Sequence, residues 1–151
     1  MTVLLGLVYA FIKQTNLSRK PLNPHAVDAV IVDNKRNVVL IRRDHPPFKG
    51  ILALPGGFII GNESPEQALI REVREETNLN IHILNKIGFY DNPSRDPRGT
   101  VTSTAFLCEI IGGVAVGEAI SIKFMPIEEA ARLDLAFDHE DIVRDALRYI
   151  E

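Results

Sequence analysis

The chain has 151 residues, of which 17 are basic and 20 acidic, so its formal net charge is -3 at pH 7. With 46% hydrophobic and 25% charged residues, the composition is that of an ordinary globular protein, and the length fits one domain. The sequence contains no basic stripe of the kind that binds a phosphate backbone, which excludes nucleic acid as an expected partner but leaves a small nucleotide possible.

The first segment of the chain, residues 3–12 (VLLGLVYAFI), is its most apolar stretch. It is shorter than a membrane span of about 20 residues and lacks the basic region and cleavage site of a signal peptide, so we expect no membrane partner. A strand or a short helix that packs on the domain or on a second subunit fits equally well. Residues 16–25 are polar with two prolines and indicate a connector. We therefore expect an N-terminal apolar segment and linker at 1–24 and one main domain at 25–151.

Hydrophobic patterning predicts the elements of the main domain. Two β-branched runs at 26–33 and 37–43 are joined by NKR and predict a hairpin. Short strands are expected around the Pro-Gly-Gly of LPGGF. Further strands are expected at 81–91, 100–110 and 120–126, and helices at 126–133 and 137–150. Asp138 is the expected N-cap of the last helix. Several strands around one central helix, without regular βαβ alternation, predict an α/β fold with a mixed β-sheet flanked by helices.

The only cysteine, Cys108, lies in an apolar strand-like run and is interpreted as a buried structural thiol. A single cysteine cannot form an internal disulfide, which favours a reducing, cytoplasmic location. The four histidines are scattered without the spacing of metal ligands, so we expect them to be surface or capping residues: His25, His45, His82 and His139.

The central helix has clear end signals. Ser64 is a good N-cap, Pro65 suits the first helical position, and Gln67 completes a capping box, which predicts a helix from Pro65 to about Thr77. At about 100° per residue, one stripe is expected to pack on the sheet. That stripe consists of Leu69, Ile70, Val73 and Thr77.

Three glutamates, Glu72, Glu75 and Glu76, fall within one turn of this helix beside the predicted buried stripe. Like charges at this spacing destabilise a helix by about 0.2–0.5 kcal/mol per pair. A glutamate-rich solvated face is one interpretation, but a solvated face gains from alternating signs, whereas this cluster has one sign and borders the core. A bound hard cation would relieve the repulsion, and carboxylate oxygens are the ligands that Mg²⁺ takes. The two glycines of LPGGF, directly before this region, allow backbone and ligand to approach closely.

These features combine into a longer motif. From Gly57 the chain reads Gly, five residues, Glu63, seven residues, REVREE (71–76), one residue, Asn78 and Leu79. This resembles the Nudix box, in which Gly, five residues, Glu, seven residues, Arg-Glu-aliphatic-any-Glu-Glu, one residue, Gly and an aliphatic residue follow one another. Every fixed position matches except the last Gly, which is Asn78. Asn is the residue after Gly that best accepts the left-handed conformation at a helix end, so we expect the mismatch to affect capping rather than chemistry.

The resemblance implies a Nudix-type α/β/α sandwich that cleaves a diphosphate linked to another moiety, with a divalent cation, usually Mg²⁺ and with Mn²⁺ as a possible substitute. Carried over by position, it implies that Glu72, Glu75 and Glu76 are metal ligands together with the backbone carbonyl of Gly56. Glu72 is also a candidate general base.

Two further box residues, Glu63 and Arg71, are implied by the resemblance to form a salt bridge that keeps the loop and the helix in register. A further carboxylate, on a loop opposite the box helix, can bind metal or act as the base in this family. Glu118 in GGVAVGEAI lies at about the right distance along the chain, although an ordinary surface charge fits it equally well.

Residues outside the box bear on the substrate. YDNPSRDPRGTVTSTAFL (90–107) is similar to the Tyr-x-x-Pro-x-Arg-Asp-Pro-Arg-Gly-His segment of ADP-ribose pyrophosphatases of this family, with Pro93 fifteen residues after Asn78. LAFDHEDIVRDAL (135–147) is similar to their C-terminal helix. One departure is Thr100, which stands where many relatives have His, so any contact of that imidazole is in doubt.

Several side chains are candidate substrate contacts. Arg95 and Arg98 lie in the loop of this segment, where guanidinium groups suit diphosphate or ribose recognition, although an ordinary solvated loop is the alternative. Arg43, at the end of a predicted strand, is a further candidate. Phe58 and Tyr90 are weaker candidates for stacking on adenine, because aromatic residues at strand ends often cover the core.

The resemblance therefore implies a Mg²⁺-dependent enzyme that hydrolyses ADP-ribose to AMP and ribose 5-phosphate. Alternatives are another substrate, such as NADH, a dinucleoside polyphosphate or a damaged nucleoside triphosphate, or a regulator that binds ADP-ribose without catalysis. Such regulators append a DNA-binding winged helix, so the chain end at Glu151 and the complete set of box acids favour an enzyme. Family members are often dimers, and the apolar N-terminal segment offers surface for a homodimer.

Overall fold

A computed structural model of the protein describes residues 24–116 and 121–150. The predictions for the segment at 1–23 and for Glu118 lie outside the described residues. The described elements, in chain order, are β1 (His25–Val32), β2 (Asn37–Arg42), β3 (Leu52–Ala53), β4 (Gly56–Phe58), α2 (Pro65–Thr77), β5 (Leu79–Tyr90), β6 (Thr102–Gly113), β7 (Ile122–Pro126), α3 (Ile127–Ala130), α4 (His139–Ala146) and the 3₁₀ helix η1 (Leu147–Tyr149).

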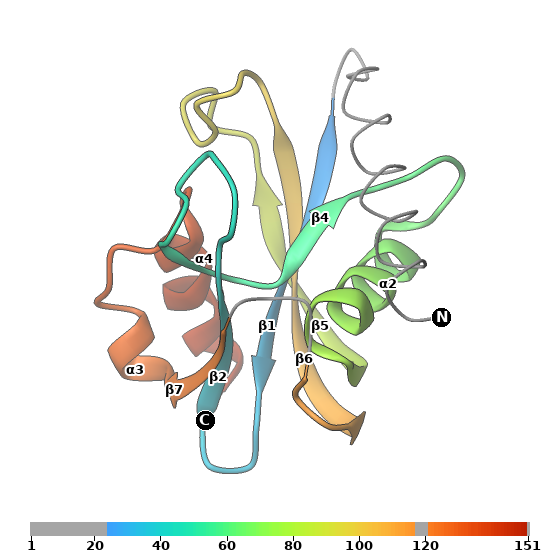
Figure 1. Ribbon diagram of the computed structural model, residues 1–151, viewed down its shortest axis with the longest axis vertical. Helices are drawn as coiled ribbons and strands as arrows, with labels where there is room; N and C mark the ends of the chain where they lie inside the picture. Colours follow the sequence, from blue (N-terminus) through green and yellow to red (C-terminus); the bar gives the residue numbers. More distant parts are fainter. Residues whose placement is uncertain (1–23, 117–120, 151) are drawn as a thin grey trace.

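The strands form one seven-stranded sheet with the order β3-β2-β1-β6-β5, in which β4 also pairs with β1 and β7 with β2. β1 and β6 are parallel, whereas the other pairs are antiparallel. α2 lies on one side of the strands, and α3 and α4 lie on the other (Figure 1). The predicted mixed sheet flanked by helices is therefore confirmed.

Alternation along β1 divides its side chains between two cores, because successive residues of a strand point to opposite faces. Val27, Ala29 and Ile31 join the core that includes Leu69 and Val73 of α2. Residues of the opposite register join the core under α4, where Val30 packs with side chains that include Ile142 and Val143. Asp28 shares the register of Val30, so the strand presents its carboxylate on the α4 side of the sheet.

Helix α2 has the predicted bounds and the predicted capping box. The Ser64 side chain accepts a hydrogen bond from the Gln67 backbone N–H, and the Gln67 side chain accepts one from the Ser64 N–H. The prediction for Ile70 is wrong, since this side chain is 47% exposed. Compared with the predicted stripe, the buried stripe is rotated about the helix axis away from Ile70 and includes Ala68 and Glu72. The small side chain of Ala68 allows the helix to approach the sheet on that side.

Asn78 ends α2 in the predicted left-handed conformation, with φ 60° and ψ 18°. Its backbone N–H donates to the Arg74 carbonyl, and its side-chain amide donates to the Val114 carbonyl at 3.1 Å. Asn78 therefore fulfils the capping role of the Gly it replaces in the box.

The C-terminal helix differs from the prediction. α4 ends at Ala146, and the chain continues as η1. Asp138 occupies the N-cap position, but its carboxylate makes no capping hydrogen bond. The physical reason is that both of its oxygens accept from Arg95, at 2.9 and 2.8 Å.

Cys108 is fully buried, as predicted, and burial raises the pKa of its thiol to about 12. The described part of the chain contains no helix that is long and apolar enough to cross a membrane.

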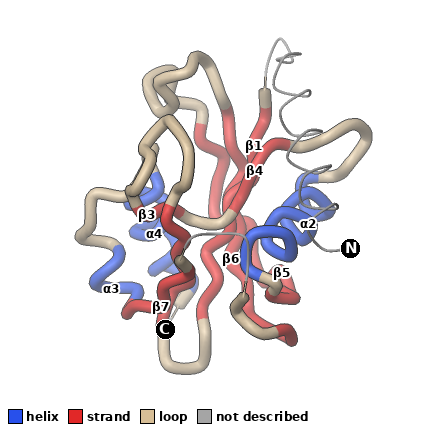
Figure 2. Tube along the Cα trace, viewed as in Figure 1, coloured by secondary structure: helices blue, strands red, loops and turns tan. Residues whose placement is uncertain are grey.

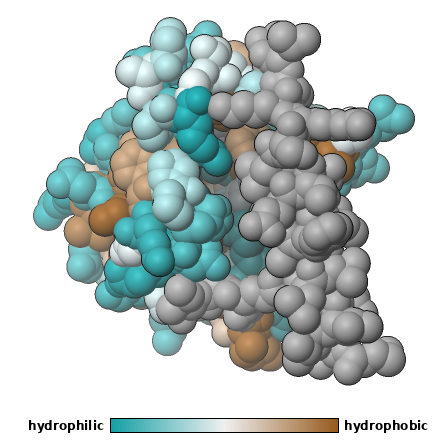
Figure 3. All heavy atoms as spheres, turned by 45° about the horizontal axis from the view of Figure 1, so that its top comes forward, coloured by the Kyte–Doolittle hydropathy of each residue, from teal (hydrophilic) through white to brown (hydrophobic). Residues whose placement is uncertain are grey.

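The connections β2–β3, β4–α2 and β5–β6 extend from the same end of the sheet (Figure 2). In a view tilted so that this end comes forward, much of the described surface is hydrophilic and hydrophobic residues form smaller patches (Figure 3). The candidate site lies among these loops.

Candidate active site

The two glycines of β4 bring the strand into direct contact with its neighbours. A Cβ atom on Gly57 would lie 2.4 Å from Cδ of Glu72, and one on Gly56 would lie 2.1 Å from the Val27 carbonyl oxygen. Any side chain at either position would displace the box helix or the sheet. The missing side chain of Gly57 therefore lets the Glu72 carboxylate, which is 2% exposed, lie directly against the strand. The sequence predicted a close approach of backbone and ligand at these glycines, and that approach stays a prediction.

Arg71 and Glu63 form the predicted salt bridge between helix and loop. Arg71 Nε donates to Glu63 Oε2 at 2.6 Å and Nη2 donates to Oε1 at 2.8 Å, which gives a bidentate pair. Hydrogen bonding to Glu63 raises the pKa of Arg71, and the same bond from Arg71 lowers the pKa of Glu63. Arg71 Nη2 also donates to the Phe58 carbonyl at 3.1 Å, so β4 is held by the same guanidinium.

Arg71 makes a second set of contacts that the sequence did not predict. Its Nη1 donates to Glu72 Oε1 at 2.8 Å and to Glu75 Oε2 at 3.3 Å. The guanidinium therefore offsets part of the repulsion between these two carboxylates and fixes their orientation toward β4.

One pocket brings together most of the predicted site residues. Glu75 and Glu76 line it from α2, and the guanidinium-bearing residues Arg43 and Arg98 line it from the β2–β3 and β5–β6 loops. Gly56, Phe58 and Arg95 also line it. An acidic helix face and two arginines therefore contact the same pocket, a distribution of charge that suits a diphosphate held together with a cation.

The box helix supplies carboxylate oxygens, which are hard ligands of the kind that Mg²⁺ binds, and Gly56 lines the same pocket as Glu75 and Glu76. Within residues 24–116 and 121–150, no three His, Cys, Asp or Glu side chains are already arranged to hold a metal ion. The residue types fit a hard divalent cation, and Glu72 and Glu75 are oriented by Arg71.

Arg98 and Arg43 each contact aromatic rings. Arg98 Cζ lies 5.2 Å from the centroid of Phe58 and 5.7 Å from that of Phe137. Its guanidinium also pairs with Asp96, which is buried, at 2.7 Å. Phe58 is thus in contact with an arginine, and its weaker candidacy for stacking on adenine stays a prediction.

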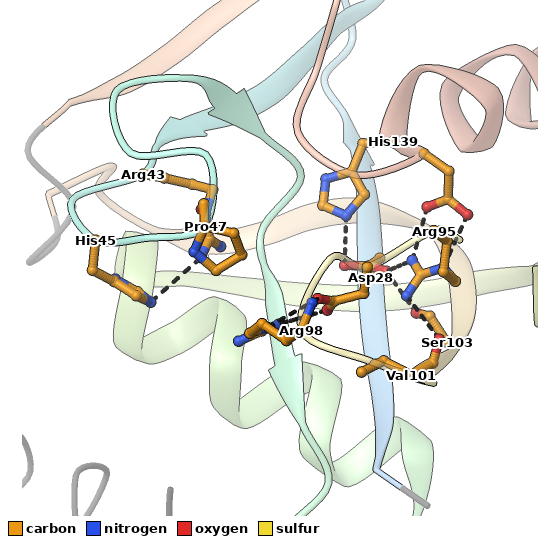
Figure 4. Close-up of polar contacts among 11 residues, drawn as sticks. Asp28, Arg43, His45, Pro47, Arg95, Arg98, Val101, Ser103 and His139 are labelled. Atoms are coloured by element: carbon orange, nitrogen blue, oxygen red, sulfur yellow. Dashed lines mark hydrogen bonds and ion pairs between the residues drawn. The ribbon is translucent and has the colours of Figure 1, made fainter. Parts of the chain in front are cut away.

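Arg43 Nε donates to the Pro47 carbonyl at 2.7 Å, and its Cζ lies 4.9 Å from the centroid of Phe137. Figure 4 shows Arg43 beside Pro47 and His45 on the β2–β3 loop, across from Arg98. Burial and the nearby positive charge of Arg98 lower the pKa of Arg43. An anion between these two arginines would reduce that repulsion.

Two predicted substrate contacts bind acidic side chains of the protein. Arg95 lines the pocket but is 7% exposed, and its guanidinium binds both oxygens of Asp138, so the alternative of an ordinary solvated loop does not apply to it. Its contact with the substrate stays a prediction. Tyr90 lies outside the residues that line the pocket, and its hydroxyl donates to Asp145 of α4 at 2.8 Å. Burial and Asp145 raise the pKa of this phenol.

A buried polar network that the sequence did not predict lies in the pocket wall (Figure 4). Asp28 accepts from the Ser103 hydroxyl at 2.6 Å and lies 3.3 Å from His139 Nε2 and 3.6 Å from Arg95 Nη2. Burial opposes ionisation of Asp28, but His139, Ser103 and Arg95 outweigh it and lower the pKa of this carboxyl.

The sequence predicted a surface or capping role for His139, and the surface role is wrong because this residue is only 3% exposed. Its Nδ1 accepts from the Leu54 backbone N–H at 2.9 Å, which leaves Nε2 to carry the proton that faces Asp28. His25 is also partly buried and bonds Thr102 and Thr104. Of the missed residues, only Asp28 gave a signal, as a charge within an apolar strand.

Comparison with known proteins agrees with the geometry. The family model described as the NUDIX domain matches residues 22–146. The chain belongs to this family. The Nudix domain is also 39% identical over 142 residues to the ADP-ribose pyrophosphatase of Methanocaldococcus jannaschii, a match that covers 91% of this chain and 83% of that protein.

Two other similar proteins are described as responding to ADP-ribose or as solved in complex with it. The ADPR responsive transcriptional repressor NtrR of Acinetobacter baylyi is 32% identical over 148 residues, which cover 91% of this chain and 58% of the repressor. The NUDIX domain of Shewanella oneidensis NrtR, solved in complex with ADP ribose, superimposes with a TM-score of 0.73 at 26% identity and covers 89% of this chain and 92% of that one. The Nudix domain thus has the fold of a domain that binds ADP-ribose.

Proposed function

We propose that this Nudix protein is a Mg²⁺-dependent hydrolase that converts ADP-ribose to AMP and ribose 5-phosphate. The observation that carries the proposal is the single pocket lined by Glu75 and Glu76 of the box helix on one side and by Arg43 and Arg98 on the other. The name of the relative from Methanocaldococcus jannaschii supports the choice of substrate.

In this proposal Glu72, Glu75, Glu76 and the Gly56 carbonyl hold Mg²⁺, and Mn²⁺ is a possible substitute. A bound divalent cation neutralises charge on the diphosphate and lowers the pKa of a coordinated water from about 15.7 toward neutrality. Arg71 keeps the carboxylates of Glu72 and Glu75 oriented through bonds of 2.8 and 3.3 Å. Arg43 and Arg98 bind the diphosphate oxygens from the opposite side.

A carboxylate then removes a proton from the attacking water, which typically contributes about 10² to 10⁴ in rate. Glu72 and Glu118 are both candidates for this base. Normal kcat in a Glu118→Gln variant would assign the role to Glu72 or another group, whereas a loss of about 10² or more with unchanged KM would assign it to Glu118.

The test is release of AMP from ADP-ribose by the full chain, with Mg²⁺ and with a chelator. Glu76→Gln should abolish turnover while leaving the circular dichroism and the melting temperature close to the wild-type values. Glu66→Gln is the matched control, since Glu66 is an exposed residue in the first turn of the same helix. Full activity of Glu76→Gln would contradict the metal assignment.

Other substrates remain alternatives within the same chemistry, so the assay should include NADH, a dinucleoside polyphosphate and 8-oxo-dGTP. Turnover of one of these without turnover of ADP-ribose would replace the proposed substrate. The similarity to the repressor NtrR favours a second candidate, a regulator that binds ADP-ribose without catalysis. Metal-dependent release of AMP at a rate that Glu76→Gln removes would exclude that candidate.

A cytoplasmic homodimer is also part of the proposal. Light scattering of the full chain, compared with a variant that lacks residues 1–20, tests the dimer. An unchanged mass on truncation would remove the N-terminal segment as the reason for it.

A further inference from the structure

Phe137 has a backbone conformation that phenylalanine rarely adopts. Its φ is 55°, in the left-handed region that disfavours residues with a Cβ atom. Such a conformation persists only where the surroundings hold it, and it often accompanies function. Phe137 immediately precedes Asp138 at the start of α4 and lines the pocket.

The neighbours of Phe137 anchor its backbone on both sides. The preceding Ala136 N–H donates to the Leu52 carbonyl at 2.9 Å. The following residues are fixed by side-chain contacts, since Asp138 binds Arg95 and His139 accepts from the Leu54 N–H. Three contacts therefore hold the chain on both sides of Phe137.

The ring lies between groups from two loops. Arg43 Cζ, from the β2–β3 loop, is 4.9 Å from its centroid, and Arg98 Cζ, from the β5–β6 loop, is 5.7 Å away. Phe48 contacts it in an edge-to-face arrangement at 4.9 Å. The two guanidiniums repel each other, and the electron-rich face of an aromatic ring attracts cations. A single ring thus contacts two like charges from different loops.

We propose that Phe137 is a positioning residue that holds Arg43 and Arg98 together so that both bind one diphosphate. The inference deepens the proposed function and rests on it only in that the pocket accepts a diphosphate. The ring itself does not contact the reacting atoms. It supplies a surface on which two cations from separate loops meet, and the left-handed backbone directs it there.

The test is calorimetric binding of inorganic diphosphate, with Mg²⁺ in excess, to the full chain. Phe137→Leu keeps an apolar side chain but removes the ring, and we expect diphosphate binding to weaken by about fivefold to tenfold, in line with the strength of cation–π contacts. Phe137→Tyr keeps the ring and should bind within about twofold of the wild type. Unfolding curves of both variants show whether each is folded under the assay conditions.

A double-mutant cycle separates positioning from simple packing. If Phe137 acts through the arginines, Phe137→Leu should weaken binding much less in an Arg98→Gln background than in the wild type. In the enzyme assay the same substitution should raise KM for the substrate while kcat changes by less than about twofold.

Three results would overturn the inference: wild-type protein that does not bind diphosphate, Phe137→Leu that binds like the wild type, or equal effects of Phe137→Leu in both backgrounds. Because calorimetry needs no turnover, failure of ADP-ribose as a substrate can be distinguished from failure of the positioning role of Phe137. In that case the proposed function falls, whereas weaker diphosphate binding by Phe137→Leu still supports the positioning role.

Discussion

The position of Glu72 illustrates how one residue depends on another at a distance in the sequence. A carboxylate that is 2% exposed needs a partner, because burying an unpaired charge is costly. Arg71 supplies that partner at 2.8 Å, and the missing side chain of Gly57 supplies the space. The first Gly of the box is therefore required by the volume of the buried Glu.

Gly57→Ala tests this requirement. The new Cβ would lie 2.4 Å from Glu72 Cδ, so the carboxylate must move away from Arg71. We expect a loss of about 1–3 kcal/mol in the free energy of unfolding, as for other overpacked sites, and a fall in kcat because a proposed metal ligand is displaced. Urea unfolding and the AMP-release assay measure the two effects.

Gly112→Ala is the matched control, since the nearest atom to its Cβ would be 3.4 Å away, which is an ordinary contact. If Gly57→Ala had the stability and kcat of the wild type, the Glu72 side chain would move without consequence and the prediction would be contradicted.

At the scale of an element, α2 has ends specified by local residues. The capping box at Ser64 and the left-handed Asn78 use contacts within or beside the helix. These features explain why the helix has the bounds that its sequence predicts. Because both ends of the helix are specified, the positions of the box glutamates along it are specified too.

Replacing Asn78 should alter stability but not chemistry. Asn78→Ala places a Cβ-bearing residue without a compensating amide at φ 60° and removes the bond to the Val114 carbonyl. We expect a loss of about 1–2 kcal/mol in the free energy of unfolding, a smaller loss for Asn78→Gly, and kcat within about twofold of the wild type for both. Thermal unfolding with parallel kinetics makes the comparison, and a large fall in kcat for Asn78→Gly would contradict it.

The start of α4 contributes to stability through a buried ion pair. The Arg95 side chain is 3% exposed and that of Asp138 is 16% exposed, so removing one charge leaves the other buried. Asp138→Asn should therefore lower the free energy of unfolding by about 3 kcal/mol. Glu128→Gln, which breaks the exposed pair with Arg36, should cause little change. Equal effects of the two substitutions in urea unfolding would argue against a buried role for Asp138.

For the whole molecule, buried carboxylates connect the sheet, the loops and α4. Burial opposes the ionisation of Asp28 and of Asp96, but hydrogen bonds and favourable electrostatic interactions with their neighbours outweigh it, and the pKa of each is lowered. Hydrogen bonding to Arg71 likewise lowers the pKa of Glu63. All three groups therefore favour the folded state when they are ionised.

The sign of the pH dependence follows. A carboxyl with a lowered pKa in the folded state contributes stability that is present above its unfolded pKa, about 4, and is lost as the pH falls through the folded value. We expect the free energy of unfolding to decrease as the pH falls below about 4. Urea unfolding across this range is the measurement, and Asp28→Asn should show a shallower slope. A stability that rises on acidification would contradict the assignment.

The sequence by itself determined the parts of the protein that depend on neighbouring residues. Helix α2 and its caps lie within one continuous stretch, where periodicity and capping residues specify the element. The Glu63–Arg71 bridge lies in the same stretch and was implied by the resemblance of its motif to the Nudix box. The order of the predicted elements, several strands around one central helix without regular βαβ alternation, likewise predicted the mixed sheet. Ile70 was misplaced because the periodicity leaves the rotation of the stripe uncertain by one residue.

Only the tertiary structure decided which loop side chains reach the pocket. Arg95 and Arg98 are three residues apart in one loop and both line the pocket, yet Arg95 is buried against Asp138 whereas Arg98 lies beside Phe58. His139 lies beside Asp28, and Phe137 beside Arg43, although the two residues of each pair are far apart in the sequence. Such pairs depend on how β1, the loops and α4 pack together, and no local pattern encodes that arrangement.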